Sequence, residues 1–224
     1  MIEVNKYIDS TLLKPEAAEA EIVKLCEDAR KYGFASVCVN PFRAELVSRS
    51  LEGSEVKTCV VIGFPLGATG LEVKLCEAAY ALGRGARELD IVMNIGAFKS
   101  RQMDVVEEEI RAVVAACAGK ALVKVILECC LLNDQEKVEA CEIAVNAGAD
   151  FVKTSTGFSS GGATVEDVKL LKETVKGRAG VKASGGIRDL WAALSMIEAG
   201  ADRIGTSAGV ALVTEAQGEG GEIV

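Results

Sequence analysis

Histidine is absent from this chain of 224 residues. Without it the chain lacks the side chain that most often exchanges protons near neutral pH, and no nucleophile pair can use histidine as its base. Any proton transfer must therefore use lysine, a carboxylate, tyrosine, cysteine or water. This absence narrows the possible chemistry more than any other feature of the composition.

Positive charge and long apolar runs are also scarce. Lysine and arginine number 25 against 33 aspartates and glutamates, which gives a net charge of -8. A nucleic-acid partner needs a basic stripe, so none is expected, and an anionic ligand must meet a local positive site. The longest uncharged stretch, residues 58–71, contains glycines and a proline and is too short to span a bilayer. The first residues lack the features of a signal peptide, so we expect a cytoplasmic protein with no membrane partner.

The eight cysteines show no C-x-x-C spacing. We therefore expect no zinc site and no other bound metal. Because a cytoplasm keeps thiols reduced, a disulfide framework is not expected either. The cysteines are Cys26, Cys38, Cys59, Cys76, Cys117, Cys129, Cys130 and Cys141.

Short apolar runs alternate along the chain with amphipathic stretches of helical length, and hydrophobic residues make up 50% of the sequence. This alternation is typical of βαβ units and predicts the α/β class, with a single (β/α)8 TIM barrel over residues 1–214 and a short flexible tail over 215–224. The expected strands are Tyr7–Ser10, Ser36–Asn40, Lys57–Gly63, Glu88–Met93, Leu122–Glu128, Phe151–Ser155, Val181–Ser184 and Arg203–Thr206.

Helix signals occupy the gaps between these strands. Pro15 and Gly33 mark the start and end of the first helix, and Asn133 with Glu136 and Thr164 with Asp167 have the spacing of capping boxes. A Gly-Ala pair also recurs before several strands. It indicates either a repeated βα unit or simply a good helix stop, and the sequence leaves both interpretations open.

Charged side chains lie inside four of the apolar strands. Alternation puts Asp90 and Asn94 on one face of a strand, gives Lys124 the same kind of position on the next, and places Lys153 and Lys182 on later strands. A single such residue is more often a structural ion pair than a catalytic group, but several on neighbouring strands point to a shared site.

In a pocket that holds two lysines and a carboxylate, one lysine can form an imine with the carbonyl group of a substrate. A free lysine is protonated at neutral pH, and burial or a second ammonium favours the neutral amine. Lys182 is expected to supply that second charge to Lys153, while Asp90 moves protons. Glycine-rich turns follow the last two expected strands, SGGIR and GTSAG, and with Arg188 and a short helix over 207–213 they predict a phosphate site.

At these residues the sequence resembles the deoxyribose-phosphate aldolase family, from YIDSTLLKP through GFPLGA, ELDIVMNIG, VKVILE, FVKTSTGF and VKASGGIR to RIGTSAG. The resemblance implies a metal-free and cofactor-free barrel enzyme that splits 2-deoxy-D-ribose 5-phosphate into glyceraldehyde 3-phosphate and acetaldehyde, as a homodimer or tetramer. Within it, Lys153 resembles the Schiff-base lysine, Lys182 the lysine that perturbs it and Asp90 the proton-transfer carboxylate. The substrate-binding residues expected from these motifs are Asp9, Thr11, Asn94, Lys124, Thr154, Gly157, Gly185, Gly186, Arg188, Gly205 and Ser207.

Three positions depart from the family pattern. Ser10 stands where many relatives have histidine, Phe158 where some have a lysine that helps hold the phosphate, and Ala208 where some have a second serine. The chain also lacks a longer tail with a tyrosine. We expect the chemistry to be retained, with the phosphate held by Arg188, Ser207 and the backbone.

Two alternatives differ in function and keep the fold. One is another phosphate-binding barrel enzyme, an isomerase or a lysine aldolase acting on a keto sugar, because a fold alone does not fix a function. The other is a catalytically silent barrel that serves as a binding or assembly subunit.

Overall fold

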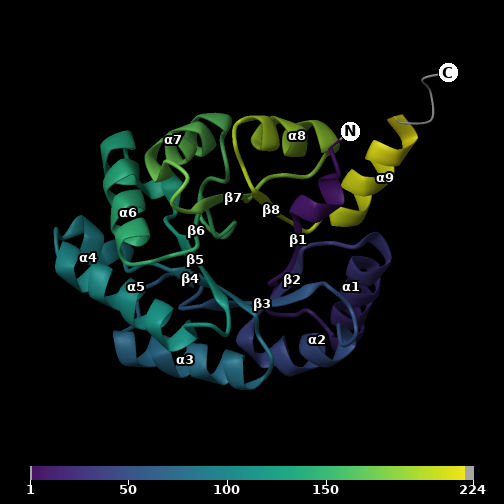
Figure 1. Ribbon diagram of the computed structural model, residues 1–224, viewed down its shortest axis with the longest axis horizontal. Helices are drawn as coiled ribbons and strands as arrows, with labels where there is room; N and C mark the ends of the chain where they lie inside the picture. The colour runs from purple at the N-terminus through teal and green to yellow at the C-terminus, as the bar shows by residue number, and fades with distance from the viewer. Residues whose placement is uncertain (1, 220–224) are drawn as a thin grey trace.

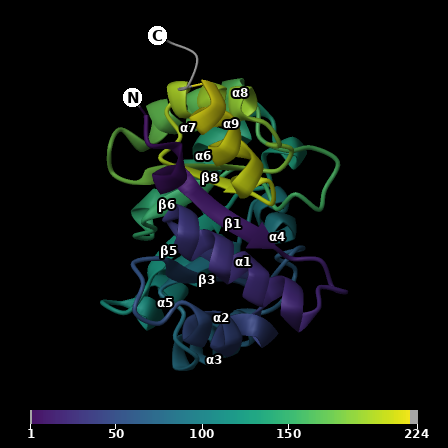
Figure 2. The same ribbon diagram turned by 90° about the vertical axis from the view of Figure 1, so that its right-hand side faces the viewer.

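Eight parallel strands close into a barrel in which each strand pairs with the next along the chain and β8 pairs with β1. The structure, a computed structural model, describes residues 2–219. Figure 1 shows the strands at the centre with the helices in a ring around them, and Figure 2 shows the same barrel from the side. The expected (β/α)8 fold is confirmed. The strands are β1 Ile8–Leu12, β2 Ser36–Val39, β3 Lys57–Ile62, β4 Glu88–Val92, β5 Leu122–Ile126, β6 Phe151–Lys153, β7 Gly180–Ser184 and β8 Arg203–Thr206.

The ends of the strands differ from those expected. The first begins at Ile8, because Val4–Tyr7 form the 3-10 helix η1, and it continues to Leu12. Strands β2 to β6 end one or two residues early. Apolar residues such as Met93 and Leu127 follow these strands and are fully buried in the loops above them. The apolar pattern therefore extended the expected strands into the rim of the barrel.

The helices that cover the barrel mostly follow the signals in the sequence, but α1 begins at Glu19, four residues after the expected start at Pro15. Helix α1 ends at Gly33, which takes a left-handed backbone with φ 66°, and Asn133 with Glu136 forms a complete capping box on α6. Thr164 caps α7 in the same way, but Asp167 instead pairs with Lys137. The helices are α1 Glu19–Tyr32, α2 Ala44–Ser50, α3 Leu71–Gly83, α4 Ile95–Lys99, α5 Met103–Cys117, α6 Asp134–Asn146, α7 Val165–Val175, α8 Leu190–Glu198 and α9 Gly209–Glu219, with short 3-10 helices η2 Pro41–Arg43 and η3 Cys129–Leu131.

The last helix runs past the boundary expected at residue 214. Helix α9 begins at Gly209, two residues after the expected start at 207, and continues through residues 215–219. The rest of the expected tail, residues 220–224, lies outside the described residues. Figures 1 and 2 show α9 beside the N-terminal segment that includes η1.

Alternation along the strands divides the barrel into two environments. Outward-facing residues such as Val60, Leu89 and Ile91 pack under the helices in one large apolar core. The inward face carries charged residues, with a small apolar cluster of Leu13, Cys38, Cys59 and Val61 above them. Within residues 2–219, no helix has the length and apolar character needed to cross a membrane.

Candidate active site

A cavity of about 410 Å³ opens at the carboxyl ends of the strands. Loops after β1, β6, β7 and β8 form its walls, which is where parallel barrels place their active sites. Its size suits a small metabolite. The lining residues are Thr11, Leu12, Leu13, Lys14, Lys153, Thr156, Gly157, Phe158, Ser184, Gly185, Gly186, Ile187, Arg188, Gly205, Thr206 and Ser207.

Lys153 joins this cavity to a buried charged cluster. Its Nζ donates a hydrogen bond of 2.8 Å to Asp90 Oδ2, and Lys182 Nζ donates one of 2.7 Å to the same oxygen. Lys153 and Lys182 are direct neighbours in the pairing of β6 with β7. Lys182 is fully buried, whereas Lys153 lines the cavity. The amine of Lys153 is therefore the only one in the cluster that reaches the space where a ligand would bind.

Further ion pairs lie below these three residues. Lys124 Nζ contacts Glu88 Oε2 at 2.6 Å and Asp90 Oδ1 at 2.9 Å, and Lys182 Nζ lies 2.6 Å from Asp9 Oδ2. Arg203 donates from Nε to Asp9 Oδ1 over 2.8 Å and from Nη2 to Glu88 Oε2. The cluster thus holds four cationic side chains against three carboxylates. One positive charge is in excess when all are ionised.

The cluster favours the ionised forms of Asp9 and Asp90 and the protonated forms of Lys124 and Lys182. Burial opposes the charge of Asp90, but the ammoniums of Lys124, Lys153 and Lys182 outweigh it and hold the pKa of this carboxyl well below its usual value. Burial likewise opposes the charge of Lys182, yet Asp9 and Asp90 hold the pKa of its ammonium above its usual value. Because Lys182 stays charged beside Lys153, the second ammonium expected from the sequence is in place.

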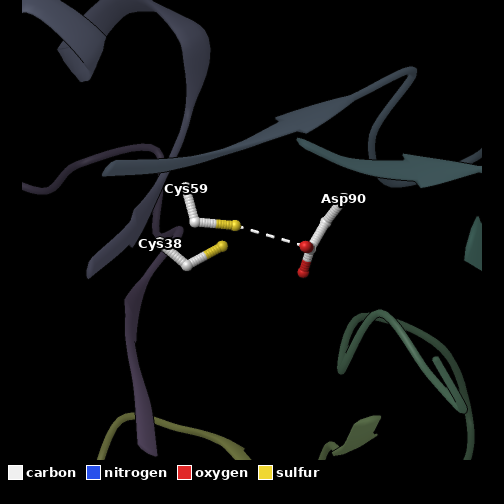
Figure 3. Close-up of side chains that lie close together, drawn as sticks. All are labelled: Cys38, Cys59 and Asp90. Carbon is white, nitrogen blue, oxygen red and sulfur yellow. Dashed lines mark hydrogen bonds between the residues drawn. The ribbon is translucent and has the colours of Figure 1, made fainter. Parts of the chain in front are cut away.

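Two cysteine sulfurs also face Asp90, as Figure 3 shows. Cys38 and Cys59 pair across β2 and β3, and the Cys59 thiol donates a hydrogen bond of 3.2 Å to Asp90 Oδ1. Their donor atoms are close enough together to hold a metal ion. However, burial raises the pKa of the Cys59 thiol well above its usual value, with the neighbouring Cys38 and Asp90 adding to it, and metals bind the thiolate.

The ammonium of Lys124 already occupies the cationic position beside these donors. Its Nζ lies 3.5 Å from Cys59 Sγ and 2.9 Å from Asp90 Oδ1. A metal ion bound there would meet this ammonium at close range and would have to displace it. The charge distribution therefore favours a metal-free site, and the absence of a metal stays a prediction.

The structure brings most of the expected substrate-binding residues to the cavity but leaves four of them outside its lining. The seven that line it are Thr11, Gly157, Gly185, Gly186, Arg188, Gly205 and Ser207. Asp9 and Lys124 lie in the buried charged cluster below. Asn94 caps α4 by accepting a hydrogen bond from Ala97, and Thr154 exchanges two hydrogen bonds with the backbone of Ser184. These four support the site from behind.

Sequence reasoning missed Glu88 and Arg203, which complete the charged cluster. Both were visible in the pattern, because Glu88 shares the alternating face of Asp90, and Arg203 that of Gly205. They were overlooked because each stands at the first residue of its strand, where a charge ordinarily faces solvent. In the barrel Glu88 is instead buried, and the tilted strands bring both beneath Asp9 and Lys124.

Phe158 and Glu128 shape the wall after β6. The ring of Phe158 meets that of Phe64 edge to face at 5.2 Å, so this part of the wall is aromatic. Glu128 is buried and takes a left-handed backbone with φ 57°, which is strained for a residue other than glycine. Its carboxylate accepts hydrogen bonds from the backbone N–H and the hydroxyl of Thr156, and that hydroxyl in turn accepts one from Phe158. Glu128 thus holds the loop next to Lys153.

Replacing Glu128 with alanine tests this support. We expect Glu128→Ala to destabilise the fold by about 1–3 kcal/mol, because buried donors of Thr156 lose their acceptor and the strained backbone remains. The KM for the ligand of the cavity should rise, since Thr156 and Phe158 line it. Urea unfolding and steady-state kinetics measure both effects. Glu173→Ala, an exposed change on α7, serves as the control, and equal results for the two variants would contradict the role given to Glu128.

The chain resembles known aldolases over nearly its full length. The family described as "DeoC/LacD family aldolase" matches residues 4–214. The deoxyribose-phosphate aldolase of Clostridium tetani is 62% identical over 96% of this chain and 100% of its own. That of Streptococcus sanguinis is 60% identical over 98% of this chain and 99% of its own.

Solved structures agree with these relatives. "QR15, an Aldolase" has a TM-score of 0.95 and 49% identity, covering 100% of both chains. The deoxyribose phosphate aldolase from Aeropyrum pernix, described as having a unique tetrameric structure, has a TM-score of 0.89 and 41% identity, with 96% of this chain and 91% of that chain covered. The similarity therefore extends from sequence to the whole barrel.

Proposed function

The chain belongs to the DeoC/LacD family of aldolases and acts as a deoxyribose-phosphate aldolase, and from this premise we propose that Lys153 forms the Schiff base of its reaction. The enzyme reversibly cleaves 2-deoxy-D-ribose 5-phosphate to D-glyceraldehyde 3-phosphate and acetaldehyde. One observation carries the proposal. Lys153 is the only lysine of the buried cluster that lines the cavity, and its Nζ donates a hydrogen bond of 2.8 Å to Asp90 Oδ2.

In the proposed reaction, the neutral amine of Lys153 adds to the aldehyde carbon of the open-chain sugar. Loss of water then gives a protonated imine. As the proton of the C3 hydroxyl is removed, the C2–C3 bond breaks and its electrons flow to the imine nitrogen, so glyceraldehyde 3-phosphate leaves and an enamine remains. Protonation of the enamine carbon and hydrolysis of the imine release acetaldehyde and restore Lys153.

The charged cluster supports each of these steps. It holds one more positive charge than its three carboxylates balance, and Lys153 is the member open to the ligand. Asp90, 2.8 Å from Lys153 Nζ, is placed to accept and return protons while the carbinolamine forms and collapses. Lys182, held on Asp9 and Asp90, keeps its positive charge beside the imine nitrogen. These roles for Lys153, Asp90 and Lys182 are proposals.

We propose that the far end of the cavity binds the phosphate. Gly185 and Gly186 both have positive φ, and this conformation turns backbone N–H groups toward an anion. A side chain at Gly205 would meet Ser184 at 2.9 Å, so only glycine allows this close passage of the chain. Arg188 and Ser207 supply a cation and a hydroxyl from the same loops.

We also propose a homo-oligomer, a dimer or tetramer, in the cytoplasm. The tetrameric description of the related structure from Aeropyrum pernix supports the assembly. All eight cysteines are free, as expected where thiols stay reduced. Sedimentation or light scattering would measure the assembly directly.

Borohydride trapping tests the position of the Schiff base. Incubation with acetaldehyde and borohydride should reduce the imine to a stable secondary amine, adding a two-carbon unit that peptide mass spectrometry locates on Lys153. Release of acetaldehyde from 2-deoxy-D-ribose 5-phosphate should be measured on the same preparation. An adduct on Lys182 or Lys124 in place of Lys153, from active enzyme, would overturn the assignment, whereas trapping of dihydroxyacetone phosphate alone would favour a keto-sugar aldolase.

A further inference from the structure

The charged residues that line the cavity are all cationic. They are Lys14, Lys153 and Arg188, and among residues 2–219 no aspartate or glutamate contributes to the lining. This contrasts with the net charge of -8 for the chain as a whole. Because Lys153 is engaged with Asp90, Lys14 and Arg188 are the two cations left to meet an anionic part of the ligand.

The order of strands around the barrel places these two cations on either side of the phosphate loops. Lys14 follows β1 in the β1–α1 loop, and Arg188 follows β7 in the β7–α8 loop. Strand β8 pairs with both β7 and β1, so the loop with Gly205 and Ser207 lies between them. An anion held by that loop would therefore have one cation on each flank.

Neither cation is committed to another partner. Within residues 2–219, no carboxylate lies within ion-pairing distance of Lys14 or Arg188, although many other lysines and arginines have such partners. Both side chains are exposed, so they can turn toward a ligand without breaking an existing contact. The opposite wall, formed by the loop after β6, is lined by Thr156, Gly157 and Phe158, which carry no charge.

We propose that Lys14 is the second phosphate cation of this cavity and a determinant of its preference for phosphorylated substrates. The proposal rests on the aldolase function stated above and extends it to a residue outside the glycine-rich loops. A phosphate dianion between Lys14 and Arg188 gains two charge-assisted contacts. Phe158, after β6, carries no charge. Lys14, in the loop after β1, supplies a cation from the other side of the cavity.

Substituting Lys14 tests the proposal on two substrates. For Lys14→Met we expect the KM for 2-deoxy-D-ribose 5-phosphate to rise about tenfold with kcat nearly unchanged, because the contact is made equally in the ground and transition states. With unphosphorylated 2-deoxy-D-ribose, kcat/KM should not change. Lys14→Arg should restore the wild-type KM. Lys169→Met, the same loss of charge at an exposed position on α7, should behave as wild type.

A binding measurement separates this proposal from the proposed function. Titration calorimetry with inorganic phosphate needs no turnover. We expect the dissociation constant for phosphate to be about tenfold larger for Lys14→Met than for wild type or Lys169→Met. Unchanged phosphate affinity and unchanged KM, or equal losses on both sugars, would overturn the role of Lys14. A wild type that binds phosphate through Lys14 but releases no acetaldehyde would instead overturn the aldolase mechanism alone.

Discussion

Replacing Lys153 with methionine is expected to abolish turnover of 2-deoxy-D-ribose 5-phosphate while leaving the fold intact. Without the amine no imine forms, and a loss in kcat on the order of 10⁵ to 10⁶ is the scale seen when a covalent nucleophile is removed. Methionine keeps an unbranched stem of similar length, so packing against the cavity wall changes little. Steady-state acetaldehyde release and borohydride trapping measure the loss.

The stability of this variant follows from the charges beneath it. Removing one of four cations leaves three against three carboxylates, and Asp90 keeps its contacts with Lys124 and Lys182. We therefore expect the free energy of unfolding in urea to stay within about 1 kcal/mol of wild type, or to rise. Lys169→Met controls for the loss of a positive charge elsewhere. Residual activity above a hundredth of wild type would argue that another lysine carries the Schiff base.

Replacing Asp90 with asparagine should damage both activity and stability. Each oxygen of Asp90 accepts from cationic or thiol groups, with Lys124 and Cys59 on Oδ1 and both Lys153 and Lys182 on Oδ2. Asparagine leaves four cations against two carboxylates in a fully buried place. We expect a loss of about 3–5 kcal/mol in unfolding free energy, the usual result of breaking a buried ion pair, and a fall in kcat of about 10²–10⁴.

A double variant keeps this prediction testable even if Asp90→Asn folds poorly. Asp90→Asn combined with Lys153→Met again has one positive charge in excess, as in wild type, so we expect it to recover part of the lost unfolding free energy. Asp104→Asn, an exposed change on α5, controls for the substitution itself. Stability losses that simply add in the double variant would show that the charge balance of the cluster does not decide its stability.

The inward positions of the charged residues were predictable from alternation, but their depth was not. Lys124 and Lys153 occupy similar positions in their strands, and sequence reasoning placed both in contact with substrate. In the barrel β5 pairs with β6 so that Ile126, two residues after Lys124, lies beside Lys153. Lys124 is therefore one layer deeper, pairs with Glu88 and Asp90, and does not reach the cavity.

The local structure around Asn94 also differs from the expected strand, for a related reason. Its strand position suggested that it would follow Asp90 toward the ligand. The strand ends at Val92, however, and Asn94 caps the short helix α4 through Ala97. A polar residue just beyond a strand has two uses, ligand contact and helix capping, and the strand end that decides between them is set by the packing of the rim.

The sequence by itself determined the barrel, the positions of Asp90, Lys153 and Lys182 within its strands and the glycine-rich turns after β7 and β8. Period-two strands, capped helices and glycine-rich turns are local signals, and Asp90, Lys153 and Lys182 each stand out because a charge in an apolar strand is costly unless paired. Only the tertiary structure decided how those charges are shared. Closure of the barrel brings Asp9, Glu88 and Arg203 from strands far apart in the chain into one buried cluster, and it places the loops that carry Lys14 and Arg188 on either side of β8, because register and strand tilt are properties of the closed sheet.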